Sequence, residues 1–318
     1  MSRRDEVLSL LELKNTGEGG RVEAEPRLIR ALHDEGDRAR VALDVLGHWC
    51  EFHGHKVTQE VFHRALTLCG SDDAKLRAEA CASLVLLRPE PTPPPGMVRA
   101  ELEVRLRDPD PGVRQEAAAA LGDLGDSKSQ PALQVRLEDE HPGVRLEAAF
   151  ALACLGDRSA RDPLEVFLDH RELRPVALEG LRRLADPAAL SALDRIRRSW
   201  LLPWADRTLA EAVAVRLGDP DGATALMKQA ERGRFEQKVY ALHLLAEERV
   251  EQAAPLMWRI VAESRDASLR SAAISALSAL GQPKYLEHLK ALAAAPETDE
   301  ELRRELWSAV TSTQRTAP

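Results

Sequence analysis

Four histidines lie close together in the segment HWCEFHGHKVTQEVFH, where the spacing is the closest in this sequence to that of a metal site. They are His48, His53, His55 and His63, and Cys50 lies among them. Zinc takes four ligands in tetrahedral geometry, often with a His-x₃₋₅-His spacing. His48 and His53 fit that spacing loosely, but helical phase does not bring the four together. We therefore expect packed or solvated histidines and no bound metal.

A tryptophan pair is the second group that could contact a ligand or partner. Trp200 and Trp204 enclose two leucines and a proline, and Arg195, Arg197 and Arg198 come just before them. Tryptophan flanked by arginine is typical of a protein-binding hot spot. The same residues could form a long turn that folds both rings into the core, and we favour this because large aromatic side chains usually bury.

No catalytic or cofactor motif is present in the sequence. It has no P-loop, no glycine fingerprint of a dinucleotide site, no nucleophile elbow and no Cys–His motif. We therefore expect no catalytic residue, no cofactor and no enzymatic activity.

Composition narrows the class of protein further. The chain has 318 residues, with 44 basic and 52 acidic side chains and a net charge of −8, which argues against non-specific nucleic-acid binding. Its four cysteines are far apart and form no CxxC pair, as in a reducing compartment. There is no signal peptide and no apolar run of the ~20 residues needed to cross a bilayer. We expect a cytoplasmic protein without membrane insertion.

A basic residue returns about every 31 positions, and this period determines the architecture. The series is Arg77, Arg114, Arg145, Arg174, Arg207, Lys238, Arg270 and Arg303. Its best copies, DPDPGVRQEAAAALGDLGD and DEHPGVRLEAAFALACLGD, begin at Asp108 and Asp139 and agree at 13 of 19 places. Self-similarity at such a period is typical of a stacked repeat array.

Each repeat predicts two helices. After Arg114, the residues Ala117, Ala120, Leu121 and Leu124 keep a helical period, and the alanines allow close helix packing. Prolines at first helical positions and glycines after the last ones mark the ends. The fold class is therefore all-α, an α-solenoid of helix pairs.

The chain divides into an array and less regular ends. Residues 1–70 form a degenerate cap, with helices expected at 4–14, 26–34, 38–50 and 57–69 and a loose stretch at 17–25. Residues 71–312 form the array, and 313–318 form a disordered tail. Within the array, RPEPTPPPG (88–96) cannot be helical. It is a stiff inter-helix loop or, less in keeping with such runs, a polyproline docking motif.

The quoted segments resemble HEAT-like repeats of the short bacterial type, which also occur in phycobilisome bilin lyases. The matching pieces are D-P-D-P-x-V-R and A-A-x-A-L-G-x-L-G-D, over about residues 71–312. The resemblance implies a right-handed, armadillo-like solenoid that acts as a protein-binding scaffold, with its second helices on the concave side. It also leaves open a bilin lyase or a chaperone-like tetrapyrrole carrier. Trp204, Asp206 and Arg207 echo HEAT-like DNA glycosylases, but the acidic balance argues against that function.

In such families the repeated acids and arginines form a structural ladder between repeats. A cation in the first turn of a helix costs about 0.3–1 kcal/mol against the helix dipole, so a repeated cation needs compensation. Asp108 and Asp139, six residues before their arginines, offer bidentate pairing. The ladder comprises Asp108, Arg114, Asp139, Arg145, Arg174, Arg207 and Arg270. An anion-binding stripe is the alternative.

A partner surface is expected on the second helices, at positions one, five and eight after each ladder cation. These positions give Leu146, Phe150, Glu179, Arg182 and His243, with Arg183 and Tyr240 beside them. An exposed apolar track rimmed by charge is typical of a protein-binding site. We expect Phe150, Arg182, Arg183, Trp200, Trp204, Tyr240 and His243 to bind a protein partner that the sequence does not identify.

Overall fold

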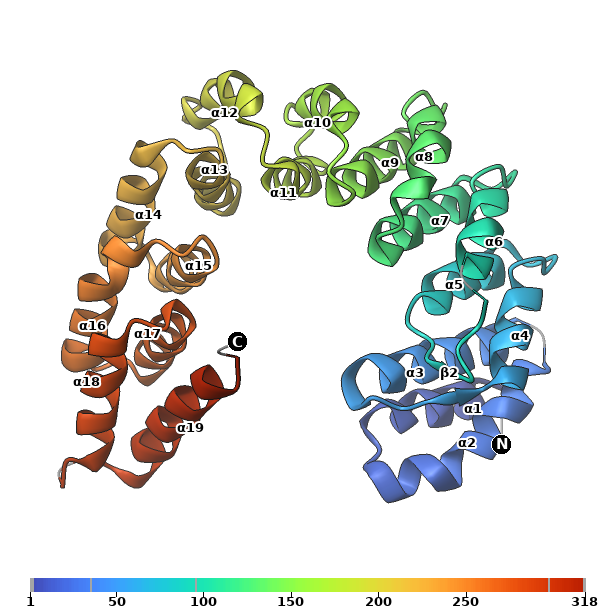
Figure 1. The fold of residues 1–318 in the computed structure, drawn as a ribbon, viewed down its shortest axis with the longest axis horizontal. Coiled ribbons are helices and arrows are strands. Elements are labelled where there is room, and N and C mark those ends of the chain that lie inside the picture. The colour runs from blue at the N-terminus through green and yellow to red at the C-terminus, as the bar shows by residue number, and fades with distance from the viewer. Residues whose placement is uncertain (1–2, 35, 95, 297, 317–318) are drawn as a thin grey trace. The chain divides into compact units, whose positions relative to one another are not determined.

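In a computed structural model, residues 3–34, 36–94, 96–296 and 298–316 are described, and they are almost entirely helical (Figure 1). The all-α fold class is confirmed. The chain divides into two compact units, Met1–Leu164 and Glu165–Pro318. The division lies within a short helix, α10 (Arg161–Phe167). The boundaries of the repeat array at residues 71 and 312 stay a prediction.

The first unit consists of helix pairs in two layers. Its helices are α1 (Arg3–Leu11), α2 (Glu18–Leu32), α3 (Asp37–His53), α4 (Gln59–Leu68), α5 (Ala74–Leu84), α6 (Met97–Arg105), α7 (Pro111–Leu124), α8 (Gln130–Arg136) and α9 (Pro142–Cys154). The odd-numbered helices, here called B helices, pack in a row from α1 to α9. Each even-numbered helix, here called an A helix, packs against the B helix that follows it.

The second unit repeats this arrangement. Its helices are α11 (Arg174–Leu184), α12 (Leu190–Arg197), α13 (Trp204–Arg216), α14 (Pro220–Arg232), α15 (Phe235–Glu247), α16 (Ala254–Glu263), α17 (Ala267–Leu280), α18 (Pro283–Ala294) and α19 (Glu300–Thr316). The B helices α11 to α19 again form a row, and α12, α14, α16 and α18 cover one side of it. Each unit is thus a stack of helix pairs.

Helix α7 shows how the sequence sets the helix ends. The side chain of Asp110 accepts hydrogen bonds from the backbone N–H groups of Gly112 and Val113 at 2.8 and 3.2 Å, which caps the helix. Pro111 occupies the first turn, where its missing N–H costs nothing. Gly125 ends the helix with a φ of 71°, a conformation that glycine adopts without strain.

The core between B helices is made of small and branched apolar side chains. On α7, Ala117 and Leu121 are completely buried and Ala120 nearly so. Gly122 lies so close to α9 that a Cβ at this position would be 2.9 Å from the Cα of Ala151. The alanines and the glycine therefore allow two backbones to approach closely. Leu124, which we expected to be in this stripe, is only half-buried.

Three segments differ from the expectations. Most of the stretch expected to be loose, 17–25, is the first part of α2, and α19 continues to Thr316, into the segment expected to be disordered. Residues 317–318 lie outside the described part of the chain. The proline-rich insert includes a strand, β2 (Pro89–Glu90), which pairs in parallel with β1 (Val57–Thr58). Pairing with a segment far away in the sequence holds the insert, which the local composition does not predict.

Candidate functional site

The ladder cation Arg114 makes a bidentate ion pair with Asp139 of the next repeat. Its Nε donates to Oδ2 at 2.9 Å and its Nη2 donates to Oδ1 at 2.8 Å. Both side chains are nearly buried. Burial opposes ionisation of Asp139, but the bonds from Arg114 and from the backbone of His141 outweigh it and lower the pKa of Asp139.

The other ladder cations do not all find an acid. Arg77 pairs with Asp108 at 2.7 Å and Arg174 with Asp206 at 2.9 Å. Arg145 donates instead to the carbonyl oxygens of Asp139 and Glu140, at 2.7 and 3.1 Å. Arg207 also donates to carbonyl groups, and the Nε of Arg270 is buried without a hydrogen-bond partner in the described part of the chain. The role of the series as a structural ladder stays a prediction.

Backbone carbonyl groups provide a second kind of partner that the sequence argument missed. Arg77, Arg114 and Arg145 each donate to the carbonyl oxygens of the residues six and five positions earlier, in the turn between the A and B helices. These groups follow the negative end of the A helix, where a cation is favourable. The unfavourable interaction of each cation with the dipole of its own B helix is therefore offset by a favourable interaction with the C-terminal end of the preceding A helix.

In the second unit, the predicted partner residue Arg182 lies in a half-buried ion cluster. It donates to both oxygens of Glu179 at 2.7 and 3.0 Å, and to Glu248 at 2.7 Å. Glu248, whose side chain is 2% exposed, also contacts Arg216 at 2.6 Å. Burial of Glu179 is outweighed by its bonds to Arg182 and Arg183, so its pKa is lowered. Arg182 links α11 to Glu248 at the end of α15, and Glu248 in turn contacts Arg216 of α13, so the bonds of Arg182 are used within the fold.

Glu248 occupies a position where the repeat pattern calls for leucine. Its burial would be costly without Arg182 and Arg216, because an unpaired charge loses its solvation. The departure from the pattern is thus matched by an arginine on each of two neighbouring B helices. The sequence alone does not predict this compensation, because the two arginines are far from Glu248 along the chain.

Four other predicted partner residues lie around this cluster, with their side chains more open to solvent. The rings of Trp204 and Tyr240 meet edge to face at 6.4 Å, and Trp204 remains 45% exposed. His243 lies one turn further along α15 and is 3.4 Å from Glu247. Arg183 is half exposed and bonds Glu179 at 3.1 Å. Burial, followed by the charge of Glu179, raises the pKa of Tyr240.

Trp200 is exposed on the loop before α13, here called the tryptophan loop (Ser199–Trp204). Its side chain is 85% exposed and that of Leu201 is 69% exposed, so the expectation that both tryptophans fold into the core is wrong. Leu202, in the same loop, is buried. Arg207 donates to the carbonyl oxygens of Arg197 and Ser199 at 3.1 and 2.7 Å. The backbone is thus held in place while Trp200 and Leu201 face solvent.

The remaining predicted partner position lies in the first unit. Phe150 is half-buried on α9, and Leu146, expected to face outward one turn earlier, is buried. The expected offset of one residue after the ladder cation was therefore wrong on α9, because a small error in helical phase moves a side chain from the surface to the core. The next residue along α9, Glu147, is half-buried.

Glu147 belongs to a row of carboxylates that the sequence argument did not identify. Glu79, Glu116 and Glu147 stand two residues after successive ladder cations, on α5, α7 and α9. Burial raises the pKa of all three, and that of Glu147 reaches about 7 because Glu116 and Asp123 add their charge. The repeat period could have revealed this row, since the three positions are equivalent.

The four clustered histidines have separate surroundings. His48 packs on Phe52 and His53, at ring separations of 4.7 and 5.7 Å. His55 is 3.4 Å from Glu25, and a ring nitrogen of His63 hydrogen bonds to the carbonyl oxygen of Gln59. Across the described ranges, no three histidine, cysteine, aspartate or glutamate side chains gather closely enough to hold a metal ion.

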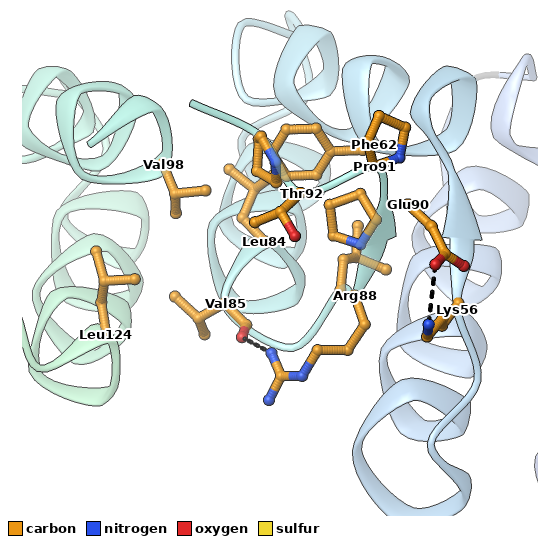
Figure 2. Close-up of a pocket in the computed structure, with 13 residues that line it drawn as sticks. Lys56, Phe62, Leu84, Val85, Arg88, Glu90, Pro91, Thr92, Val98 and Leu124 are labelled. Carbon is orange, nitrogen blue, oxygen red and sulfur yellow. Dashed lines mark hydrogen bonds and ion pairs between the residues drawn. The ribbon is translucent and has the colours of Figure 1, made fainter. Parts of the chain in front are cut away.

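The proline-rich insert forms one wall of a cavity in the first unit (Figure 2). The cavity is about 680 Å³ and lies among α4, α5, α6 and the insert. Phe62, Leu84 and Leu87 line it and are nearly buried, while Val98 and Leu124 line the opposite side. The proline-rich composition of the insert predicts a spacer and does not predict a cavity.

Comparison with known proteins agrees with the stacked helix pairs. A sequence profile for HEAT repeats matches residues 62–153, and a profile for the PBS lyase HEAT-like repeat matches residues 144–170 and 269–294. The fold is that of an α-solenoid. These matches identify HEAT-like repeats within residues 62–170 and 269–294, those at 144–170 and 269–294 being of the phycobilisome lyase type. No curated protein matches the sequence.

Two solved structures illustrate the likeness in fold. The complex of CpcE and CpcF of phycocyanin lyase from Nostoc sp. PCC7120 matches with 21% identity and a TM-score of 0.53, over 83% of this chain and 98% of that one. The karyopherin Kap121p, bound to the extreme C-terminus of the phosphatase Cdc14p, matches with 15% identity and a TM-score of 0.50, over 92% of this chain and 38% of that one. Such identities show the fold alone.

None of the described helices is both long and apolar enough to span a membrane.

Proposed function

We propose that this protein is a non-enzymatic scaffold that binds a partner protein through the tryptophan loop of its second unit. The supporting observation is the exposure of Trp200 and Leu201 on a backbone held by Arg207 and by buried Leu202. Adjacent exposed apolar side chains are typical of an interaction site, and tryptophan is enriched among binding hot spots. A loop that is already ordered loses little entropy on binding.

The surface of the B helices extends this contact. Trp204 and Tyr240 form an aromatic pair at the start of α13 and on α15. Further along, a hollow of about 600 Å³ lies between α15 and α17, with His243 and Glu247 on one side and Ala272 and Ala276 on the other. Aromatic anchors beside a hollow of this size suit a partner that inserts apolar side chains.

Affinity capture from native lysate tests the proposal. Trp200→Ala should lose the captured protein, because truncating a central hot-spot tryptophan costs about 2 kcal/mol or more, or over tenfold in affinity. Trp307→Ala is the matched control, because Trp307 is 44% exposed on α19 of the same unit. Equal capture by both variants would contradict the proposal. So would recovery of a stoichiometric small molecule or metal in place of any protein.

A second candidate function is a bilin lyase or a chaperone-like tetrapyrrole carrier. It is supported by the match of the PBS lyase HEAT-like repeat profile at residues 144–170 and 269–294. Adding a free bilin and recording its visible spectrum separates the two candidates. A shifted band with one bilin per chain would favour the carrier, and an unchanged spectrum would favour the scaffold.

A DNA glycosylase function has less support. Asp206 is nearly buried and accepts a hydrogen bond from Arg174, and Arg207 holds the tryptophan loop. Two of the three side chains that echo the glycosylase set are therefore engaged in the fold. Salt-sensitive DNA binding would be the observation in favour of that function.

A further inference from the structure

We propose that the cavity beside the proline-rich insert binds a medium-chain fatty acid, with its carboxylate at Arg88 and its alkyl chain along the apolar wall. The step between ladder cations is 37 residues across this insert, against 29 to 33 elsewhere. The extra residues, 88–93 among them, form one wall of the cavity. The proposal concerns the first unit and does not depend on the proposed partner site.

The insert is fixed in position by contacts with the segment before α4. The backbone N–H of Val57 donates to the carbonyl oxygen of Arg88 at 3.0 Å, within the pairing of β1 and β2. Lys56 pairs with Glu90 at 3.0 Å, and the side chain of Gln59 donates to the carbonyl oxygen of Pro91. Because three contacts hold it, the wall is preformed, as in most small-molecule sites.

The lining favours an alkyl chain. Phe62 and Leu84 form a nearly buried apolar floor, and Val98 and Leu124 face it across the cavity (Figure 2). Leu87, also nearly buried, lines the same cavity. All of these side chains are aliphatic except the aromatic ring of Phe62, and none of them can form a hydrogen bond with a polar ligand. A volume of about 680 Å³ lies within the usual range for small-molecule sites, roughly 300–1,000 Å³.

Charge at the edge of the cavity favours a carboxylate as the head group. Lys56 is neutralised by Glu90, whereas the guanidinium of Arg88 makes one hydrogen bond, from Nη1 to the carbonyl oxygen of Val85 at 3.0 Å. Figure 2 shows this group beside Val85, at the end of the cavity away from Phe62. Its other N–H groups have no partner in the described part of the chain, and a guanidinium fork binds a carboxylate in bidentate fashion.

Calorimetric titration of the full chain with hexanoate, octanoate and decanoate tests the proposal. We expect one saturable site, with affinity rising about fourfold for each added methylene group. Decanol, which has the same chain but no charge, should bind at least tenfold more weakly than decanoate, because it loses the charged hydrogen bond. Equal binding of decanol and decanoate, or no binding of decanoate, would overturn the proposal.

Three variants locate the site. Arg88→Gln should weaken decanoate binding about tenfold or more, while Arg107→Gln, which removes an exposed arginine outside the cavity, should not change it. Val98→Phe narrows the cavity at its apolar wall and should shift the preference from decanoate to shorter acids. Thermal unfolding of each variant shows whether it remains folded. Unchanged binding by Arg88→Gln and Val98→Phe would place the fatty acid elsewhere and refute the site.

Discussion

Removing Arg114 should destabilise the first unit more than removing the equivalent Arg145. The side chains of Arg114 and Asp139 are 7% and 3% exposed and share two hydrogen bonds. Breaking a buried ion pair costs about 3–5 kcal/mol, because the remaining charge stays buried without its partner. Asp139 would keep Arg136 at 3.3 Å and the N–H of His141 at 3.0 Å. We therefore expect Arg114→Ala to cost about 3 kcal/mol.

Arg145 provides the matched comparison, because it stands at the same position of the next repeat. Arg145 donates to the backbone carbonyl oxygens of Asp139 and Glu140. When the arginine side chain is removed, both carbonyl groups can accept hydrogen bonds from water instead. Arg145→Ala should therefore cost about 1 kcal/mol. The difference of about 2 kcal/mol is the contribution of the buried acid.

Urea unfolding followed by circular dichroism measures both variants, and a double-mutant cycle isolates the pair. Asp139→Asn removes the charge that Arg114→Ala strands, so the double variant should be about 1–2 kcal/mol more stable than the sum of the single changes predicts. The reasoning is refuted if Arg114→Ala costs no more than Arg145→Ala. It is also refuted if the coupling lies within about 0.5 kcal/mol of zero.

Three further predictions concern pH and packing. Burial and neighbouring carboxylates raise the pKa of Glu147 to about 7, so its ionisation destabilises the fold increasingly as pH rises from about 4. Urea unfolding should therefore show that Glu147→Gln stabilises the protein by up to about 3 kcal/mol at pH 8 and not at pH 4. The exposed control Glu138→Gln should give no gain at either pH. The pKa of Asp139 is lowered, so its contribution is present at neutral pH and is lost as pH falls through its folded pKa; the stability lost in Asp139→Asn at pH 7 should shrink at about pH 3, and an undiminished loss would contradict the ion-pair account. Gly122→Ala places a Cβ 2.9 Å from the backbone of α9 and should lower the melting temperature by an amount equivalent to about 1–3 kcal/mol, whereas Gly19→Ala, with open space around it, should not lower it.

The helix pairs could be predicted from sequence because each repeat carries its own start and stop signals. Asp110, Pro111 and Gly125 act within a few residues of themselves, and the spacing of small residues sets the face that packs. Because the same signals recur in successive repeats, they predict the helix ends more strongly than a single copy would. These features need no knowledge of the neighbouring chain.

The candidate sites were less predictable because they depend on contacts between distant segments. The proline-rich insert became a cavity wall by pairing with Val57, and Glu248 is tolerated in the core because Arg182 and Arg216 reach it. The exposure of Trp200 depends on the buried anchor Leu202, which the sequence does not distinguish from its neighbour Leu201. In each case the sequence shows the residue but not the residue or segment that it contacts in the fold.

The most direct test of the scaffold account is site-specific photocrosslinking at the tryptophan loop. p-Benzoylphenylalanine would replace Trp200 in one sample and Trp307 in another, and both would be irradiated in native lysate. The account predicts a discrete adduct with a partner protein from position 200 and none from position 307. No adduct at position 200, or the same adducts from both positions, would contradict it.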